Sequence, residues 1–225
     1  MALVGLLDCN NFFVSCERLF RPDLWDKPVA VLSSNDGCIV ARSQEVKDLG
    51  IPMGAPYFQV QDICKREHVT LFSGNLTFYR DISARVMQTL ADEVGACEIY
   101  SVDEAFFSVP DVFTEHDAQG VRDALLQKVG IPVSVGVART KTLAKVASEI
   151  GKKGDGAFLL TQALWRERSL ATSTGSIWGL GRAMTAKLGE MGVKSAAEFM
   201  ALTRSSLRCE FGIGTERIYD ELHGK

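Results

Sequence analysis

The sequence predicts an α+β fold on a ferredoxin-like plan, in which helices pack against one face of an antiparallel sheet. The first supporting observation is hydrophobic periodicity, which gives the order β-α-β-β-α-β once residues 12–79 are set aside. The second is the position of two acidic fragments, around Asp8 and around Asp103-Glu104, at the ends of predicted strands. The third is the change after residue 152, where helical segments are punctuated by Gly-x-Gly pairs.

Each element of this plan follows from a local pattern. In chain order the predicted elements are a strand at 3–7, a helix at 80–94, strands at 97–102 and 105–109, a helix at 117–129 and a strand at 132–138. The first of these helices has Ile82, Val86 and Leu90 at intervals of four residues, and Gly95 ends it. A further helix is predicted at 141–152.

The stretch between the first strand and that helix predicts a small inserted α/β unit. A helix at 12–20 stops near Pro22, and a helix at 43–49 ends at Gly50. Between them, short strands at 29–32 and 38–41 flank the turn sequence Asn35-Asp36-Gly37.

The predicted topology brings the acidic fragments together. The first and second strands run parallel with the third between them, so the end of the first lies beside the turn joining the other two. Asp8 is at that end, and Asp103 and Glu104 form that turn. Singly, such residues are typical of a helix N-cap and of a solvated turn. Together, three close carboxylates need a counterion, and oxygen ligands favour a hard cation such as Mg²⁺, a pair of which supports phosphoryl transfer.

The helix at 141–152 has a row of basic side chains. At 100° per residue, Lys145, Ser148 and Lys152 fall within about 40° of Lys141, opposite the apolar residues. An ordinary solvated face would show the same lysines. Because the row contains no acid, and Glu149 is predicted to point elsewhere, we expect Lys141 and Lys145 to contact DNA phosphates.

Two similar glycine motifs follow in the C-terminal part. They are Trp178-Gly179-Leu180-Gly181 and Phe211-Gly212-Ile213-Gly214, each before a helical run. A single Gly-x-Gly is often only a helix cap. Two in a basic region indicate a helix-hairpin-helix contact, in which free backbone N–H groups bind DNA phosphates, assisted here by Arg182.

Composition excludes several classes of protein. Among the 225 residues no apolar run reaches membrane-span length, and the N-terminal apolar run is too short for a signal peptide. Six scattered cysteines indicate reduced thiols and a cytoplasmic protein. From Arg139 to Lys225 there are 14 Lys and Arg and 9 Asp and Glu, against 11 and 19 in the preceding part. The basic second part suits a polyanion.

Several of these stretches together resemble the Y-family (translesion) DNA polymerases, in the family's order along nearly the whole chain. They are 8–17 (DCNNFFVSCE), 35–42 (NDGCIVAR), 100–106 (YSVDEAF), 140–145 (TKTLAK) and 178–182 (WGLGR). The resemblance implies a ferredoxin-like palm at 1–10 and 74–163, inserted α/β fingers at 11–73, and a helical, helix-hairpin-helix-like thumb at 164–225. It implies two Mg²⁺ ions as cofactor.

The resemblance also assigns roles to individual residues. Asp8, Asp103 and Glu104 are implied to be the catalytic magnesium ligands, with the Cys9 carbonyl assisting. The implied nucleotide-binding residues are Asn11, Phe12, Phe13, Val40, Ala41, Gln44, Lys47 and Lys152. Phe13 matches the steric gate that leaves no room for a 2′-hydroxyl, whereas Phe12 alone is typical of core packing. Gln44 departs from the tyrosine of many relatives.

The leading hypothesis is template-directed addition of deoxynucleotides to a primer end opposite damaged DNA. The implied partners are primer–template DNA and deoxynucleoside triphosphates, with a UmuD-like protein and a processivity clamp, near the bacterial nucleoid and away from membranes. Relatives continue beyond the thumb into a little-finger domain that grips DNA, so a catalytically weak or inactive DNA-binding fragment is the alternative. A nucleotidyl cyclase also uses carboxylates on such a sheet, but it needs no grip on a duplex.

Overall fold

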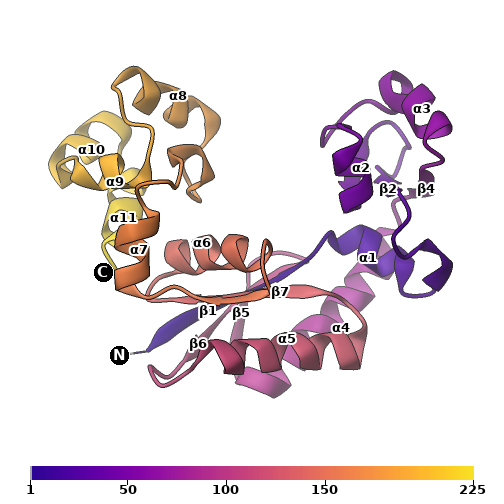
Figure 1. Cartoon of the computed structure of the whole chain (residues 1–225), viewed down its shortest axis with the longest axis horizontal. Coiled ribbons are helices and arrows are strands. Elements are labelled where there is room, and N and C mark those ends of the chain that lie inside the picture. The colour runs from indigo at the N-terminus through magenta and orange to yellow at the C-terminus, as the bar shows by residue number, and fades with distance from the viewer. Residues whose placement is uncertain (1) are drawn as a thin grey trace.

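The computed structural model describes residues 2–225 and contains two sheets (Figure 1). The larger sheet has the strand order β5-β6-β1-β7-β8. Its strands are β1 (Leu3–Cys9), β5 (Cys97–Ile99), β6 (Glu104–Val109), β7 (Val133–Ala138) and β8 (Ala157–Leu159). β6 lies between β1 and β5 and is antiparallel to both, which confirms the predicted order. β8, parallel to β7, was not predicted, because a three-residue strand carries too little periodicity.

The two faces of this sheet are covered by different elements (Figure 1). Helices α4 (Leu76–Val94) and α5 (Glu115–Val129) cover one face, where Leu7 lies in a buried core. Helix α6 (Lys141–Gly151) and the C-terminal helices cover the other, where Leu6 and Phe106 belong to a second core. Because strand side chains alternate between faces, Asp8 shares the α6 face with Leu6.

Capping side chains set where α4 and α5 begin. The Asn75 side chain accepts a hydrogen bond from the Phe78 N–H, so α4 starts four residues before the predicted helix. Thr114 and Asp117 form a reciprocal capping box at the start of α5. Both helices end at glycines with positive φ, Gly95 and Gly130.

Helix α6 lies directly on the backbone of β7. A Cβ added at Gly136 would fall 2.1 Å from the Ser148 nitrogen and 2.4 Å from the Ala144 carbonyl oxygen. Only glycine permits this approach. The close packing holds α6, and the lysines it carries, near the ends of β1 and β6.

The inserted unit, residues 11–73, extends to one side of the larger sheet (Figure 1). Its sheet has the order β3-β2-β4. Its elements are α1 (Phe12–Arg18), a 3₁₀ turn (Pro22–Leu24), β2 (Val29–Leu32), β3 (Ile39–Arg42), α2 (Gln44–Asp48), α3 (Tyr57–Arg66) and β4 (Thr70–Ser73). The strands and α2 match the predicted ones within one residue, whereas α3 and β4 were not predicted.

The C-terminal unit, from residue 162 onward, is helical as predicted. Its elements are α7 (Gln162–Arg168), a 3₁₀ turn (Thr174–Ser176), α8 (Arg182–Glu190), α9 (Ala196–Ala201), α10 (Arg204–Phe211) and α11 (Ile213–Leu222). Buried Trp165 ties its first and last helices, since its indole N–H donates to the Leu222 carbonyl at 2.9 Å. Within residues 2–225, no helix has both the length and the apolar character needed to cross a membrane.

Candidate active site

Three carboxylates lie at one edge of the larger sheet, and we call Asp8, Asp103 and Glu104 the acidic edge. Asp8 and Glu104 are direct partners in the antiparallel register of β1 and β6. The backbone N–H of Cys9 donates to the Asp103 carbonyl at 2.9 Å. The structure therefore brings the predicted residues together by strand pairing.

Their local positions differ from the prediction. Asp8 lies inside β1 rather than after it, and Glu104 begins β6 rather than sitting in the turn. β5 ends early because the N–H groups of Tyr100 and Ser101 both donate to the Glu104 carbonyl, which closes the turn over residues 100–103. Strand geometry thus fixes the direction of two of the carboxylates.

The charge of Asp8 is costly in this position. Burial raises the pKa of Asp8 to about 6, and the Glu104 and Asp103 carboxylates add to the rise, whereas Lys152 opposes it. A cation placed among these groups would relieve the same repulsion. The acidic edge is therefore a site where positive charge is favoured.

In the structure, Lys145 of α6 and Lys152, the C-cap residue of α6, supply that positive charge. Lys152 Nζ lies 2.9 Å from Asp8 Oδ2, and Lys145 Nζ lies 2.9 and 3.1 Å from the two Glu104 oxygens. The hydroxyl of Ser101 donates to Asp103 Oδ1 at 2.6 Å. Each carboxylate of the acidic edge is thus engaged by a neighbouring side chain.

The predicted lysine face of α6 is therefore only partly right. Lys141 pairs with Glu98 of β5, and Ser148 is buried against β7 rather than exposed. Glu149 does not point elsewhere, because its carboxylate accepts from Lys152 at 2.7 Å. The helical angle alone could not show that acids on the adjacent strands meet this row.

The acidic edge has the right ligand type for a hard divalent cation, because its side chains offer only oxygen. Their present rotamers, however, turn toward the lysines and Ser101. Over residues 2–225, the side chains form no group of three His, Cys, Asp or Glu poised to hold a metal ion. A metal ion could bind here only if it replaced the lysines as the counterion of the carboxylates.

A cavity of about 270 Å³ adjoins Asp8 between the larger sheet and the inserted unit. Most of the predicted nucleotide-binding residues line it, together with two carboxylates of the acidic edge. Its lining comprises Asp8, Cys9, Asn11, Phe12, Phe13, Val40, Ala41, Arg42, Met53, Asp103 and Lys152. Phe12 is also buried in the core, as its sequence pattern suggested, while Phe13 is half-buried and stacks on Tyr79 with ring centres 4.3 Å apart.

Three cations, Arg42, Lys47 and Lys152, lie at or near this cavity. Lys47 Nζ donates to Asn11 Oδ1 at 2.7 Å. Burial lowers the pKa of Lys47, and the charges of Arg42 and Lys152 lower it further, so these three groups lie close enough to repel. An anion would stabilise them. Gln44 bonds to Asp48 on its own helix at 2.8 Å instead of lining the cavity.

The sequence reasoning did not assign Arg42 and Met53 to the site. Arg42 could have been found, because it follows Val40 by two positions in a strand and so points to the same side. Its Nε is buried and lacks a hydrogen-bond partner among the described residues. Met53 is exposed in a loop, and no sequence pattern indicates its position.

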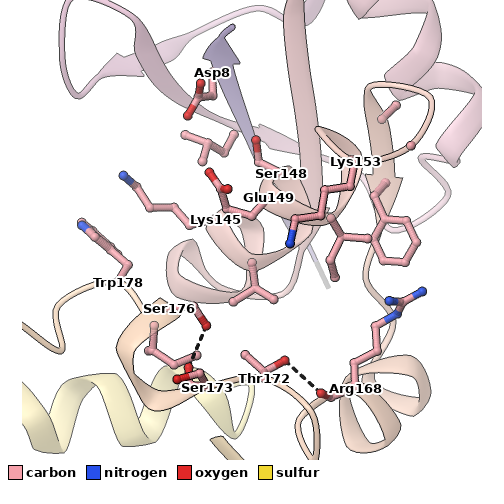
Figure 2. Close-up of a pocket in the computed structure, with 18 of the residues that line it drawn as sticks. Asp8, Lys145, Ser148, Glu149, Lys153, Arg168, Thr172, Ser173, Ser176 and Trp178 are labelled. Carbon is pink, nitrogen blue, oxygen red and sulfur yellow. Dashed lines mark hydrogen bonds between the residues drawn. The ribbon is translucent and has the colours of Figure 1, made fainter. Parts of the chain in front are cut away.

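A second, larger cavity of about 1090 Å³ lies on the other side of Asp8, between α6 and the C-terminal unit (Figure 2). Figure 2 shows Lys145, Lys153, Arg168 and Trp178 around it, with Asp8 at one end. Glu104 also lines it. The acidic edge is therefore open to a cavity on each side.

The two glycine motifs each precede a helix whose start lacks a side-chain cap. Gly181 is the N-cap of α8, and Gly212, with φ of 87°, is the N-cap of α11. Gly179 also has a positive φ, and Ile218 of α11 packs against it. Gly214 lies inside α11, so the second motif is a single-glycine turn rather than the predicted Gly-x-Gly hairpin.

Comparison with known proteins gives consistent matches. The impB/mucB/samB family profile matches residues 7–149. Protein UmuC of Salmonella typhimurium is 40% identical over 232 residues, covering 99% of this chain and 55% of that protein. DNA polymerase IV of Corynebacterium diphtheriae is 30% identical over 213 residues, covering 92% and 47%. The chain spans about half the length of these curated relatives.

Solved structures share the fold. The crystal structure of DinB from Sulfolobus solfataricus superposes with a TM-score of 0.83 at 22% identity, covering 98% of this chain and 66% of that one. An insertion ternary complex of Dbh DNA polymerase gives a TM-score of 0.84 at 22% identity, with the same coverage.

Proposed function

The chain belongs to the impB/mucB/samB family of Y-family DNA polymerases, and we propose that it carries the active site of a translesion DNA polymerase. The reaction is template-directed transfer of a deoxynucleotide to a primer 3′ end, with release of pyrophosphate. The observation that carries the proposal is the cavity beside Asp8, which is lined by the carboxylates Asp8 and Asp103 and by the cations Arg42 and Lys152, with Lys47 close to those cations. A metal-bound nucleoside triphosphate has the complementary pattern of charge.

The acidic edge would hold two Mg²⁺ ions. In this assignment Asp8 and Asp103 would ligate both ions with help from the Cys9 carbonyl, and Glu104 would ligate one and orient the attacking 3′-hydroxyl. Bound there, the ions would lower the charge repulsion of the attacked phosphate and activate the hydroxyl.

The residues of the cavity would bind and select the nucleotide. Lys47, Lys152 and Arg42 bind the triphosphate tail and stabilise the negative charge that grows on the leaving pyrophosphate. The Phe13 ring, fixed by its stack on Tyr79, excludes a sugar with a 2′-hydroxyl. Residues 38–41, of which Val40 and Ala41 line the cavity, form a small-residue roof over the nascent base pair, which leaves room for damaged bases.

In this assignment residues 1–10 and 74–163 are the palm, 11–73 the fingers and 164–225 the thumb. The thumb contacts the DNA backbone through the uncapped helix starts at Gly181 and Gly212 and through Arg182, which is exposed. Lys141 and Lys145 reach DNA only after releasing Glu98 and Glu104. We also propose a UmuD-like protein and a processivity clamp as further partners, as the resemblance of the sequence implies.

Primer extension tests the proposal. Purified protein, Mg²⁺ and single nucleotides are incubated with primed templates that are undamaged or carry one lesion, with and without EDTA. We expect one-nucleotide extension that follows the template base, occurs opposite the lesion and stops in EDTA. Tight binding of the primer–template without extension would instead favour a non-catalytic DNA-binding role.

A further inference from the structure

Lys145 is held by groups from three separate segments of the chain. Its ammonium lies 2.9 and 3.1 Å from the Glu104 oxygens, 4.8 Å from the ring centre of Tyr100 and 4.9 Å from that of Trp178. Glu104 and Tyr100 belong to the larger sheet and its turn, whereas Trp178 belongs to the C-terminal unit. Figure 2 shows Lys145 and Trp178 side by side at one end of the larger cavity.

The rings around Lys145 also pack against one another. Trp178 meets Tyr100 edge-on with ring centres 5.4 Å apart, and it contacts Phe106 of β6 at 6.0 Å. The Lys145 and Glu104 side chains are only 16% and 17% exposed, so water screens their attraction weakly. Aromatic faces attract an ammonium group and strengthen its hold at this position.

This arrangement conflicts with a metal ion at Glu104, because both carboxylate oxygens already accept from Lys145. A divalent cation must displace the ammonium before it can bind there. Lys152 differs, since it is shared between Asp8 and Glu149 within the sheet and α6. Lys145, by contrast, pairs with Glu104 and also contacts Trp178, a residue of the C-terminal unit.

We propose that Lys145 is the resident counterion of Glu104 in the metal-free protein and that Trp178 is a positioning residue that sets how firmly Lys145 is held. Metal binding at Glu104 is then coupled to the contact between the sheet and the C-terminal unit. The proposal rests on the proposed function, because it takes Glu104 as a metal ligand. Coupling of this kind is reciprocal, so a metal ion that displaces Lys145 also loosens the Trp178 contact.

Binding of Mn²⁺ to the full chain, without DNA or nucleotide, tests this coupling by electron paramagnetic resonance. Lys145→Met removes the competing charge at similar length, and we expect Mn²⁺ to bind roughly tenfold more tightly, the effect of losing one charge-assisted pair. Trp178→Ala should tighten binding by roughly two- to fivefold. Trp178→Phe keeps an aromatic face and should restore an affinity close to that of the parent protein.

Two controls separate the possible failures. Phe158→Leu removes another ring–cation contact, with Arg168 at 5.1 Å, and should leave Mn²⁺ affinity unchanged. Asp103→Ala should weaken Mn²⁺ binding. If Mn²⁺ does not bind the parent protein, or Asp103→Ala has no effect, the metal site fails and the proposed function fails with it. If Asp103→Ala weakens binding while Lys145→Met and Trp178→Ala match the parent protein, only the coupling is overturned.

Hydrogen exchange gives the reciprocal measurement. Saturating Mg²⁺ should speed amide exchange in residues 173–181 of the parent protein, because that segment loses its contact with Lys145. The same addition should change little in Lys145→Met, where the contact is already absent. Unchanged or slower exchange in the parent protein would overturn the coupling.

Discussion

The acidic edge and the helix starts of the C-terminal unit hold charge in opposite ways. At the acidic edge, half-buried carboxylates are already paired with Lys152 and Lys145. At Gly181 and Gly212, backbone N–H groups begin helices without any side-chain cap. A ligand must therefore exchange with internal partners at the first region, whereas it can add directly at the second. The first region is therefore suited to selective binding that is coupled to internal contacts, whereas the second is suited to any phosphate backbone.

The largest effect should come from removing a carboxylate at the acidic edge. Asp103→Ala should lower the rate of primer extension by at least roughly a thousandfold, because a metal ion contributes several kcal/mol to the transition state. The control is Asp62→Ala, which removes an exposed aspartate of α3. Circular dichroism should show both variants folded. If folded Asp103→Ala extended primers at the parental rate, the acidic edge would not be the catalytic region.

The next effect concerns the burial of Asp8. Since the folded state raises its pKa to about 6 from 3.8, protonated Asp8 stabilises the metal-free protein. This stabilisation is complete below about pH 4 and is lost as the pH rises through about 6, to a total of no more than about 3 kcal/mol. Urea unfolding in EDTA at several pH values measures it. Asp8→Asn should lack this component, and identical pH profiles for the two proteins would contradict the assignment.

Sugar selection should change by a somewhat smaller factor. Phe13→Ala opens the cavity beside the sugar, so discrimination between deoxyribonucleotides and ribonucleotides should fall by roughly 10- to 100-fold. Single-nucleotide insertion rates with each triphosphate provide the ratio. Phe20→Ala, which changes an exposed phenylalanine after α1, is the matched control. Unchanged discrimination in Phe13→Ala would remove Phe13 from its role as gate.

The smallest effect should come from the helix starts, because their contacts are exposed and independent. Arg182→Ala should weaken DNA binding a few-fold and reduce the salt slope of the binding constant by about one, as for the loss of one phosphate contact. Fluorescence anisotropy at several salt concentrations measures both. Arg85→Ala, on the helix covering the opposite face of the sheet, should change neither. Equal slopes for all three proteins would show that the helix starts do not contact DNA.

The sequence predicted the sheet order and the meeting of the carboxylates because both follow from strand periodicity and connection rules. It missed β8, whose three residues carry too little periodicity, and α3, an amphipathic helix that starts after Pro56 without a side-chain cap. It also missed the pairing of Lys145 with Glu104, because these residues are 41 positions apart and belong to different elements. The spacing of residues along one helix shows which side chains share a face of that helix. It does not describe the charges that a packed neighbour presents to that face.

Gly136 affects the ion pairs of the acidic edge although it contacts none of the charged groups. Because Gly136 has no side chain, α6 packs directly on the β7 backbone, and this contact sets the distance between α6 and the sheet. Any larger residue would lift the helix and lengthen every ion pair across that gap at once. Gly136, which has no side chain of its own, thus influences how strongly the lysines attract the carboxylates of the acidic edge. Its tolerance to change should match that of a ligand residue rather than that of an ordinary sheet residue.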